Sequence, residues 1–406
     1  MNLLTHIRSV KVNSLFMNYA FYTLFLFYGL NLKAQSDLLC QGNYWTEDEA
    51  VQRMAEFKSH WKTQKEWEAR AEVIRQGILD GLKWDKMPSV SQAPKIILGP
   101  EQIKNGYKLQ NIALESFPGF YVTGNLYSPL NLEPPYAGVL STHGHFENAR
   151  FTAEEQLRNA ALAQMGAVVF AYDMIGYGES NQIDHKMPIA LLLQTWNSKR
   201  VLDYFELRAD IDPNRIAISG ASGGGTQSFV LGAIDPRIKV SVPVVQVSAH
   251  FFGGCVCESG MPIHKSNNHQ TNNVEIAALM APKPQLIVSD GADWTKNTPQ
   301  LEFPYLKEVY KVYSSENAIQ NAHFEKEKHD YGPSKRNATY QFLSKHLKLP
   351  RGLKTDQKTY DERSIELLES EELMLFSTQK RPENELKGTA AVMEFLGFNS
   401  FVFSLR

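Results

Sequence analysis

Residues 215–226 read Arg-Ile-Ala-Ile-Ser-Gly-Ala-Ser-Gly-Gly-Gly-Thr, an apolar run that changes abruptly into a glycine-rich turn. The run 215–219 is typical of a buried strand, and 224–234 has the pattern of a helix. Between them, Gly220-Ala221-Ser222-Gly223-Gly224 matches the motif Gly-x-Ser-x-Gly. In a strand-turn-helix setting this motif indicates a nucleophile elbow, in which a strained backbone projects a serine hydroxyl.

The chain around this turn alternates between short apolar runs and helix-like stretches. Such alternation requires parallel strands joined by right-handed crossovers, with helices on both faces of the sheet. We therefore predict an α/β-hydrolase fold with a doubly wound, mostly parallel sheet. The predicted strands are 137–142, 167–172, 215–219, 240–245, 285–289 and 318–323, and the predicted helices are 153–164, 188–207, 224–234, 274–280, 301–314 and 335–346.

The segments outside this alternation divide the chain further. Scattered Trp and Ile at helical spacing predict an N-terminal helical segment over 35–92. Antiparallel strands are expected near 95–98, 108–115 and 120–127, at the start of a catalytic domain that spans 93–350. The charged stretch 351–406 is predicted to be an appended C-terminal segment docked on that domain.

Residues 1–34 have the pattern of a secretory signal peptide. A nearly uncharged run over 15–30 follows Arg8 and Lys11 and precedes Lys33-Ala34-Gln35, which resembles a cleavage site. The run is shorter than the roughly 20 apolar residues of a usual membrane span. We predict export of the chain, with no stable membrane span after cleavage.

Composition narrows the classes of function. The 406 residues are 43% hydrophobic and 21% charged with a net charge of -2, and no basic stripe indicates a nucleic-acid partner. Cys40, Cys255 and Cys257 are too few for a disulfide scaffold. One bond from Cys40 to either of the others and three unpaired thiols both remain open. Nothing in the sequence indicates the oligomeric state.

A serine hydroxyl needs a base to accept its proton and a carboxylate to hold that base in the correct tautomer. In this fold the acid follows the nucleophile and the histidine comes last, each on a loop after a late strand. His329 occupies that position and is the predicted base. His323 and His346 are alternatives that fall within a predicted strand and a predicted helix.

The acid lies in Ser289-Asp290-Gly291-Ala292-Asp293-Trp294, which offers two carboxylates. Asp293 is preferred because it lies deeper in the loop. We expect Asp290, at the end of the strand, to brace the loop by accepting backbone N–H bonds. The choice between the two stays open at this point.

Negative charge on a tetrahedral intermediate needs N–H donors from two loops. Gly223 supplies the first, and the second is expected from 142–146, with His145 preferred and Gly144 as the alternative. Histidine and cysteine side chains bind zinc, so a zinc site built from His143, His145, Cys255 and Cys257 is an alternative interpretation of this loop. Because nothing else gives ligand spacing, we expect no metal and no cofactor.

Several side chains fall on loops at the predicted carboxyl end of the sheet, where such folds bind ligands. Aromatic platforms suit sugar rings, and a cation would matter for a substrate that carries a carboxylate. The predicted substrate-binding residues are Phe146, Arg150, Phe252 and Trp294, with Phe251, His264 and Lys265 nearby.

Motifs outside the elbow carry a family resemblance. They are His143-Gly144-His145, the stretches 173–180 and 272–284, and His329-Asp330-Tyr331-Gly332. With these motifs the chain, over about 93–348, resembles the acetyl-xylan-esterase-like α/β hydrolases, which include secreted carbohydrate esterases and pectin methylesterases. The stretch 253–258 departs from the better-known acetyl xylan esterases. The resemblance implies export to a periplasm and removal of acetyl or methyl ester groups from plant polysaccharide.

The leading hypothesis is therefore a secreted serine carbohydrate esterase that works through an acyl-enzyme. A serine peptidase shares the triad, but 36–135 is too short for a propeller of about 40 residues per blade. A non-catalytic carbohydrate-binding homologue is the third class, and the intact order of Ser222, Asp293 and His329 argues against it.

Overall fold

The computed structural model describes residues 38–91, 93–353, 357 and 359–398. The predicted signal peptide lies outside the described residues. Within the described ranges, every helix is too short or too polar to cross a membrane.

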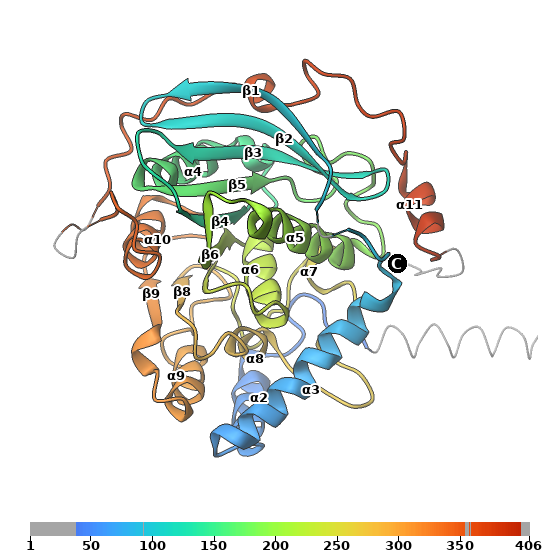
Figure 1. Cartoon of the computed structure of the whole chain (residues 1–406). Helices are drawn as coiled ribbons and strands as arrows, with labels where there is room; N and C mark the ends of the chain where they lie inside the picture. The colour runs from blue at the N-terminus through green and yellow to red at the C-terminus, as the bar shows by residue number, and fades with distance from the viewer. Residues whose placement is uncertain (1–37, 92, 354–356, 358, 399–406) are drawn as a thin grey trace, which may run out of the picture.

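One nine-stranded sheet organises the molecule, with strand order β1-β2-β3-β5-β4-β6-β7-β8-β9 (Figure 1). β1 to β3 pair antiparallel, as do β3 and β5, whereas the remaining neighbours are parallel. The predicted doubly wound sheet with an antiparallel start is confirmed. The strands are β1 Ile96–Lys104, β2 Tyr107–Phe117, β3 Phe120–Pro129, β4 Tyr136–Thr142, β5 Ala167–Tyr172, β6 Ile211–Ala221, β7 Val240–Val244, β8 Gln285–Asp290 and β9 Ile319–Phe324.

Helices cover both faces of this sheet, which is why its central strands are apolar throughout. Val139 and Val169 pack in one layer with α4 (Ala153–Met165) and α10 (Pro333–His346). Their neighbours in the strands point the other way, toward α5 (Ala190–Leu207) and α6 (Gly223–Ile234). The remaining α-helices are α2 Glu47–Ser59, α3 Gln64–Leu82, α7 Val256–Ser259, α8 Asn273–Ala278, α9 Glu302–Val312 and α11 Thr389–Phe395.

β1 is longer than the sequence pattern predicts. It runs to Lys104 as the edge strand and pairs with β2 across an irregularity between Leu98 and Glu101. Pro100 lies in that irregularity, where a residue without an N–H is tolerated. Because most side chains of this edge strand are partly or fully exposed, hydrophobic periodicity could not reveal it.

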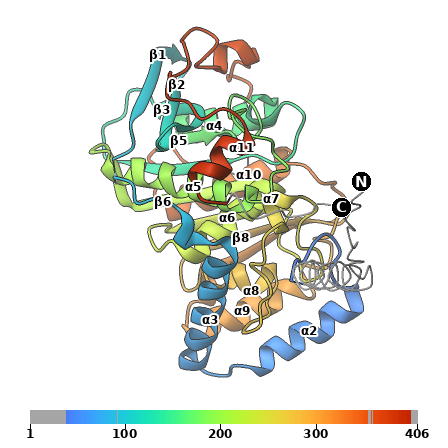
Figure 2. The ribbon, with the colours of Figure 1, turned by 90° about the vertical axis from the view of Figure 1, so that its right-hand side faces the viewer.

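α2 and α3 lie at the opposite end of the molecule from β1 (Figure 2). Thr46 and Thr63 form capping boxes that start these two helices. The buried Trp61 donates its indole N–H to Tyr305 on α9 at 3.0 Å. Arg70 forms an ion pair of 2.5 Å with the fully buried Glu275 on α8. These contacts attach the N-terminal helices to α8 and α9.

The C-terminal segment 359–398 runs across the antiparallel end of the sheet (Figure 1). Asn111 on β2 donates to Glu372 O at 2.9 Å, and Asn125 on β3 donates to Leu373 O at 2.8 Å. These side-chain amides are buried, so the segment supplies acceptors that they would otherwise lack.

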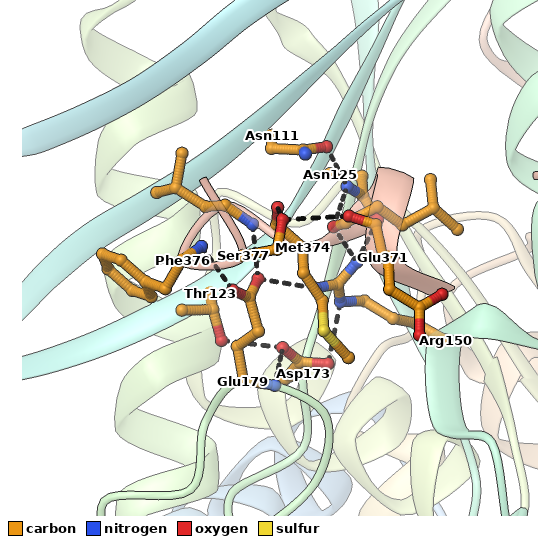
Figure 3. A network of polar contacts seen from close by, with 12 residues as sticks. Asn111, Thr123, Asn125, Arg150, Asp173, Glu179, Glu371, Met374, Phe376 and Ser377 are labelled. Carbon is orange, nitrogen blue, oxygen red and sulfur yellow. Dashed lines mark hydrogen bonds and ion pairs between the residues drawn. The ribbon is translucent and has the colours of Figure 1, made fainter. Parts of the chain in front are cut away.

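A buried ion network joins this segment to the loops after β4 and β5 (Figure 3). Arg150 donates to Asp173 Oδ1 at 2.8 Å, to Glu179 Oε2 at 3.2 Å and to Leu373 O at 3.0 Å. The Arg150 side chain is 1% exposed and that of Asp173 is 0% exposed. Two carboxylates out of reach of water therefore depend on one guanidinium.

Glu179 also receives two backbone N–H bonds from the segment. Leu375 N donates to Glu179 Oε2 at 2.9 Å, and Phe376 N donates to Glu179 Oε1 at 2.6 Å. Thr123 Oγ1 donates to the other oxygen of Asp173 at 2.7 Å. The loop after β5 is thus held by contacts from β3 and from the C-terminal segment.

We expect Arg150→Met to lower the free energy of unfolding by about 3–5 kcal/mol, because it leaves two buried carboxylates without their cation. Arg363→Met is the matched control, since Arg363 pairs with Asp361 at the surface with a side-chain exposure of 90%, where water screens the ion pair and its loss is expected to leave stability nearly unchanged. Urea unfolding of both variants measures the difference. Equal losses in the two variants would contradict the assigned importance of the network.

Candidate active site

Ser222 lies on the sharp turn between β6 and α6. Its backbone has φ 56° and ψ −122°, a conformation that L-residues rarely adopt. Ser222 N donates to Val244 O at 3.0 Å, which fixes the turn against β7. The predicted strand-turn-helix arrangement is present, and it holds the serine at the carboxyl end of the sheet.

Two glycines of the motif are required by close contact with the end of β4. A Cβ on Gly220 would lie 2.1 Å from Thr142 Oγ1, and a Cβ on Gly224 would lie 2.7 Å from Thr142 O. Thr142 Oγ1 donates to Gly224 O at 2.8 Å, so the two segments are also hydrogen-bonded. The turn and the loop after β4 therefore fit together only without side chains at these positions.

We expect Gly224→Ala to lower the melting temperature, because overpacking of such a contact costs about 1–3 kcal/mol. Gly254→Ala is the control, since a Cβ there would meet only Phe251 Cζ at an ordinary 3.7 Å. Thermal unfolding followed by circular dichroism compares the two. Unchanged stability of Gly224→Ala would show that the contact is looser than the structure indicates.

The loop 142–146 lies directly against Ser222. A Cβ on Gly144 would lie 3.0 Å from Ser222 Cβ and 2.9 Å from Ala221 O. His143 Nδ1 donates to Gly144 O at 2.8 Å, and its Nε2 accepts from Met174 N at 2.9 Å. Burial lowers the pKa of His143 to about 4, so the ring is neutral near pH 7 and can fill both roles.

The three predicted oxyanion donors come together around Ser222. Gly223 begins α6, where the first backbone N–H groups lack partners within the helix. Gly144 faces Ser222, and the ring of His145 would lie 2.7 Å from a Cβ on Gly223. The start of α6 and the loop after β4 thus both lie next to the serine.

The predicted base and acid form a hydrogen bond. His329 Nδ1 lies 2.6 Å from Asp293 Oδ2, and the Asp293 side chain is only 4% exposed. Thr295 donates to Asp293 Oδ1 through both its N–H and its hydroxyl, each at 2.6 Å. The carboxylate is therefore fixed, and His329 Nε2 is the ring nitrogen left for another partner.

Asp290 has the bracing position that the sequence predicted. Its Oδ1 accepts from Ala292 N at 3.1 Å, and its Oδ2 lies 3.2 Å from the buried ammonium of Lys335. Lys335 on α10 also donates to Lys328 O at 2.5 Å and Asp330 Oδ1 at 2.9 Å. One buried cation thus joins the end of β8 to the loop that carries the histidine.

The two alternative histidines have other partners. His323 on β9 contacts Ser289 Oγ and Glu325 Oε2, each at 2.9 Å. His346 at the end of α10 packs on Phe342, with ring centroids 4.3 Å apart.

Two predicted substrate-binding residues lie at this site. Trp294 stacks on Phe251 at 4.0 Å between centroids and lies 4.5 Å from the ring of His329. Phe146 is partly exposed in the loop after β4.

The other two predicted substrate-binding residues are wrong. Arg150 is buried in the ion network and its donors are already used. Phe252 is 0% exposed and packs between Trp45 and His264. Both side chains stabilise the fold instead of facing a ligand.

An open depression beside Asp293 includes residues that the sequence did not predict as part of the site. It draws on the N-terminal segment as well as the loops after β7 and β8. Glu47 and Lys296 form an ion pair of 2.8 Å within it. The depression is lined by Asn43, Glu47, His250, Gly291, Ala292, Asp293, Trp294 and Lys296.

Four potential metal ligands also meet near the elbow. The ligand atoms of His145, His185, Cys255 and Cys257 all lie within 4.8 Å of one another. His143, which the sequence grouped with them, points elsewhere, and His185 from the loop after β5 takes its place. All three cysteines are free, so a bond from Cys40 is not formed in this structure.

Known proteins resemble the chain at several levels. A sequence model of the fungal glucuronyl esterase family matches residues 177–275. The structure of methylesterase BT1017 is 36% identical and superposes with a TM-score of 0.80, covering 88% of this chain and 79% of that one. A 4-O-methyl-glucuronoyl methylesterase of Podospora anserina is 34% identical over 87 residues, which are 21% of this chain and 16% of that protein. A glucuronoyl esterase from Solibacter usitatus, 15% identical with a TM-score of 0.50, covers 71% of this chain and 94% of its own and shares the fold.

Fold and relatives together define the class: the chain is an α/β hydrolase of the carbohydrate esterase type. Within this class it belongs to the family that includes methylesterase BT1017. The expectation from the sequence motifs that the chain belongs to a carbohydrate esterase family of α/β hydrolases is confirmed.

Proposed function

We propose that the chain hydrolyses methyl esters of uronic acids in a polysaccharide such as pectin, through a covalent acyl-enzyme. Membership in a family of carbohydrate esterases supports the hydrolysis of esters on a polysaccharide. Two of the relatives are named as methylesterases, one of them specific for a glucuronoyl methyl ester, and this favours methyl over acetyl esters.

The observation that carries the proposal is the 2.6 Å hydrogen bond between His329 Nδ1 and Asp293 Oδ2. It fixes the tautomer in which His329 Nε2 accepts a proton, as a general base beside a serine requires. Asp293 also stabilises the imidazolium that forms. Ser222 lies on the strained turn after β6, at the same carboxyl end of the sheet as the loops after β8 and β9 that carry Asp293 and His329.

In the first step Ser222 Oγ attacks the carbonyl carbon of the ester, and its proton passes to His329 Nε2. The negative charge that develops on the carbonyl oxygen accepts N–H bonds from Gly223 and from His145, with Gly144 as the alternative donor. The C–O bond to the methoxy group then breaks, and His329 gives its proton to the departing oxygen. Methanol leaves, and a uronoyl ester of Ser222 remains.

Water completes the cycle. His329 removes a proton from a water molecule, whose oxygen attacks the acyl carbon. The bond from the acyl carbon to Ser222 Oγ then breaks, and His329 returns the proton to Ser222 Oγ. The product is a free uronate. Trp294 lies beside His329 and Lys296 lines the adjacent depression, so they are the side chains proposed to contact a sugar ring and a neighbouring carboxylate.

The test measures methanol and acetate released from methyl-esterified pectin and from acetylated xylan. We expect methanol from pectin, and we expect Ser222→Ala to lower the rate by at least about 10³-fold, because the loss of the nucleophile removes the covalent route. Acetate without methanol would replace the proposed methyl ester by an acetyl ester. Undiminished hydrolysis by Ser222→Ala would refute the mechanism.

A matched pair of histidine variants tests the base. His329→Gln is expected to lower kcat by about 10²–10⁴-fold, which is the usual contribution of a general base. His323→Gln is expected to retain the wild-type rate, because His323 contacts Ser289 and Glu325. The opposite ranking of the two variants would show that the base is His323.

A further inference from the structure

Two imidazoles and two thiols point at one another beside the nucleophile elbow. His145 Nε2 lies 3.1 Å from His185 Nε2 and 3.1 Å from Cys257 Sγ. His185 Nε2 lies 3.2 Å from Cys255 Sγ. Three loops contribute these groups, those after β4, β5 and β7.

The spacing of these atoms fits a tetrahedral zinc ion. Zinc binds thiolate sulfur at about 2.3 Å and imidazole nitrogen at about 2.0–2.1 Å, which places neighbouring ligand atoms about 3.3–3.8 Å apart. The three observed separations are a few tenths of an ångström shorter, and the whole set lies within 4.8 Å. Two cysteines and two histidines are also a usual donor set for structural zinc.

Groups around the cluster orient the ligands as metal sites require. His185 Nδ1 donates to Ile175 O at 2.7 Å, so the lone pair on Nε2 faces the cluster. Glu258 N donates to Cys255 O at 3.0 Å, and Cys255 N donates to the carboxylate of Glu258 at 3.0 Å. These bonds fix the tautomer of His185 and the backbone of Cys255.

The absence of a side chain at Gly176 lets His185 lie close to it within the loop after β5. Gly176 has φ +75°, and a Cβ there would lie 2.6 Å from His185 N. The ring of Tyr177 lies 4.8 Å from that of His185 and 6.1 Å from that of His145, both edge to face. Cys257 is fully buried beneath them.

We propose that His145, His185, Cys255 and Cys257 bind one zinc ion as a closed structural site. With four protein ligands the ion has no open position for water or substrate. Zinc displaces the thiol protons, which pass to solvent, and no oxidant or reductant takes part. The ion holds the loops after β4, β5 and β7 together.

The location gives the ion a positioning role. The ring of His145 packs against Gly223, and the backbone of the same residue belongs to the loop proposed to supply an oxyanion donor. Fixing that ring fixes the loop. This effect on catalysis rests on the proposed function, whereas metal binding itself does not.

The first test is the metal content of the full chain purified under reducing conditions and exposed to zinc before gel filtration. We expect about one zinc per chain by mass spectrometry of the elements, and a loss of at least about tenfold in the Cys255→Ser/Cys257→Ser double variant, which lacks both thiolates. Cys40→Ser is the matched control, since Cys40 is buried outside the cluster. It is expected to keep its zinc.

Replacement of zinc by cobalt identifies the ligands. Tetrahedral cobalt with two thiolates gives intense visible bands and a sulfur-to-metal charge-transfer band in the near ultraviolet. We expect these bands in the wild-type chain and a weaker, shifted spectrum in His185→Asn. Zinc should also raise the melting temperature of the metal-free chain but not that of the double cysteine variant, because binding to the folded state is coupled to folding.

Absence of bound zinc and of the cobalt spectrum in the reduced, folded wild-type chain would overturn the proposal, and so would equal zinc in the wild-type chain and the double variant. The first outcome would mean that the four groups only hydrogen-bond to one another. Zinc binding without ester hydrolysis would refute the proposed function and leave the site standing. Ester hydrolysis without zinc binding would overturn the zinc site and leave the proposed function standing.

Discussion

The fit between the turn at Ser222 and the end of β4 is the contact on which the rest of the site depends. Ser222 occupies a strained conformation, and such strain persists only where the surrounding structure fixes the backbone from several sides. Here Gly220 and Gly224 allow Thr142 to approach, and β7 accepts the N–H of Ser222. The same approach brings Gly144 against the serine, so one packing contact positions both the proposed nucleophile and the loop proposed to bind the oxyanion.

Buried charges hold the surrounding loops in place. Lys335 joins Asp290 to the loop of His329, and Arg150 joins Asp173 and Glu179 to the C-terminal segment. Such pairs contribute little net stability, but removal of one partner is costly. They therefore act here mainly to give each loop a single position. The proposed zinc site would join the loops after β4, β5 and β7 in the same way.

The sequence predicted the features that have a local pattern. The apolar runs gave the central strands, and the order of Ser222, Asp293 and His329 along the chain picked out the pair that the structure brings to 2.6 Å. Asp293 could be preferred to Asp290 but not chosen with certainty, because both follow the same strand. The hydrogen bond to His329 distinguishes them.

The features that were missed depend on how distant loops meet. In the sequence, Arg150 and Trp294 are equally good candidates for contact with a ligand. In the structure, Arg150 is buried in an ion network with a segment 223 residues further along the chain. His185 lies 40 residues from His145, with no spacing that would indicate a shared ligand. Asn43 and Glu47 line the depression beside Asp293 because the start of α2 and the residues before it pack there. Hydrophobic periodicity does not predict where such a segment packs.

The most direct measurement of the central claim is the mapping of a fluorophosphonate adduct by peptide mass spectrometry. The serine oxygen attacks phosphorus and fluoride leaves, so only an activated serine is labelled quickly. The account predicts one adduct per chain, on the peptide that contains Ser222, with labelling slowed in His329→Gln. Labelling of a different residue, or an unlabelled chain that still hydrolyses esters, would contradict it.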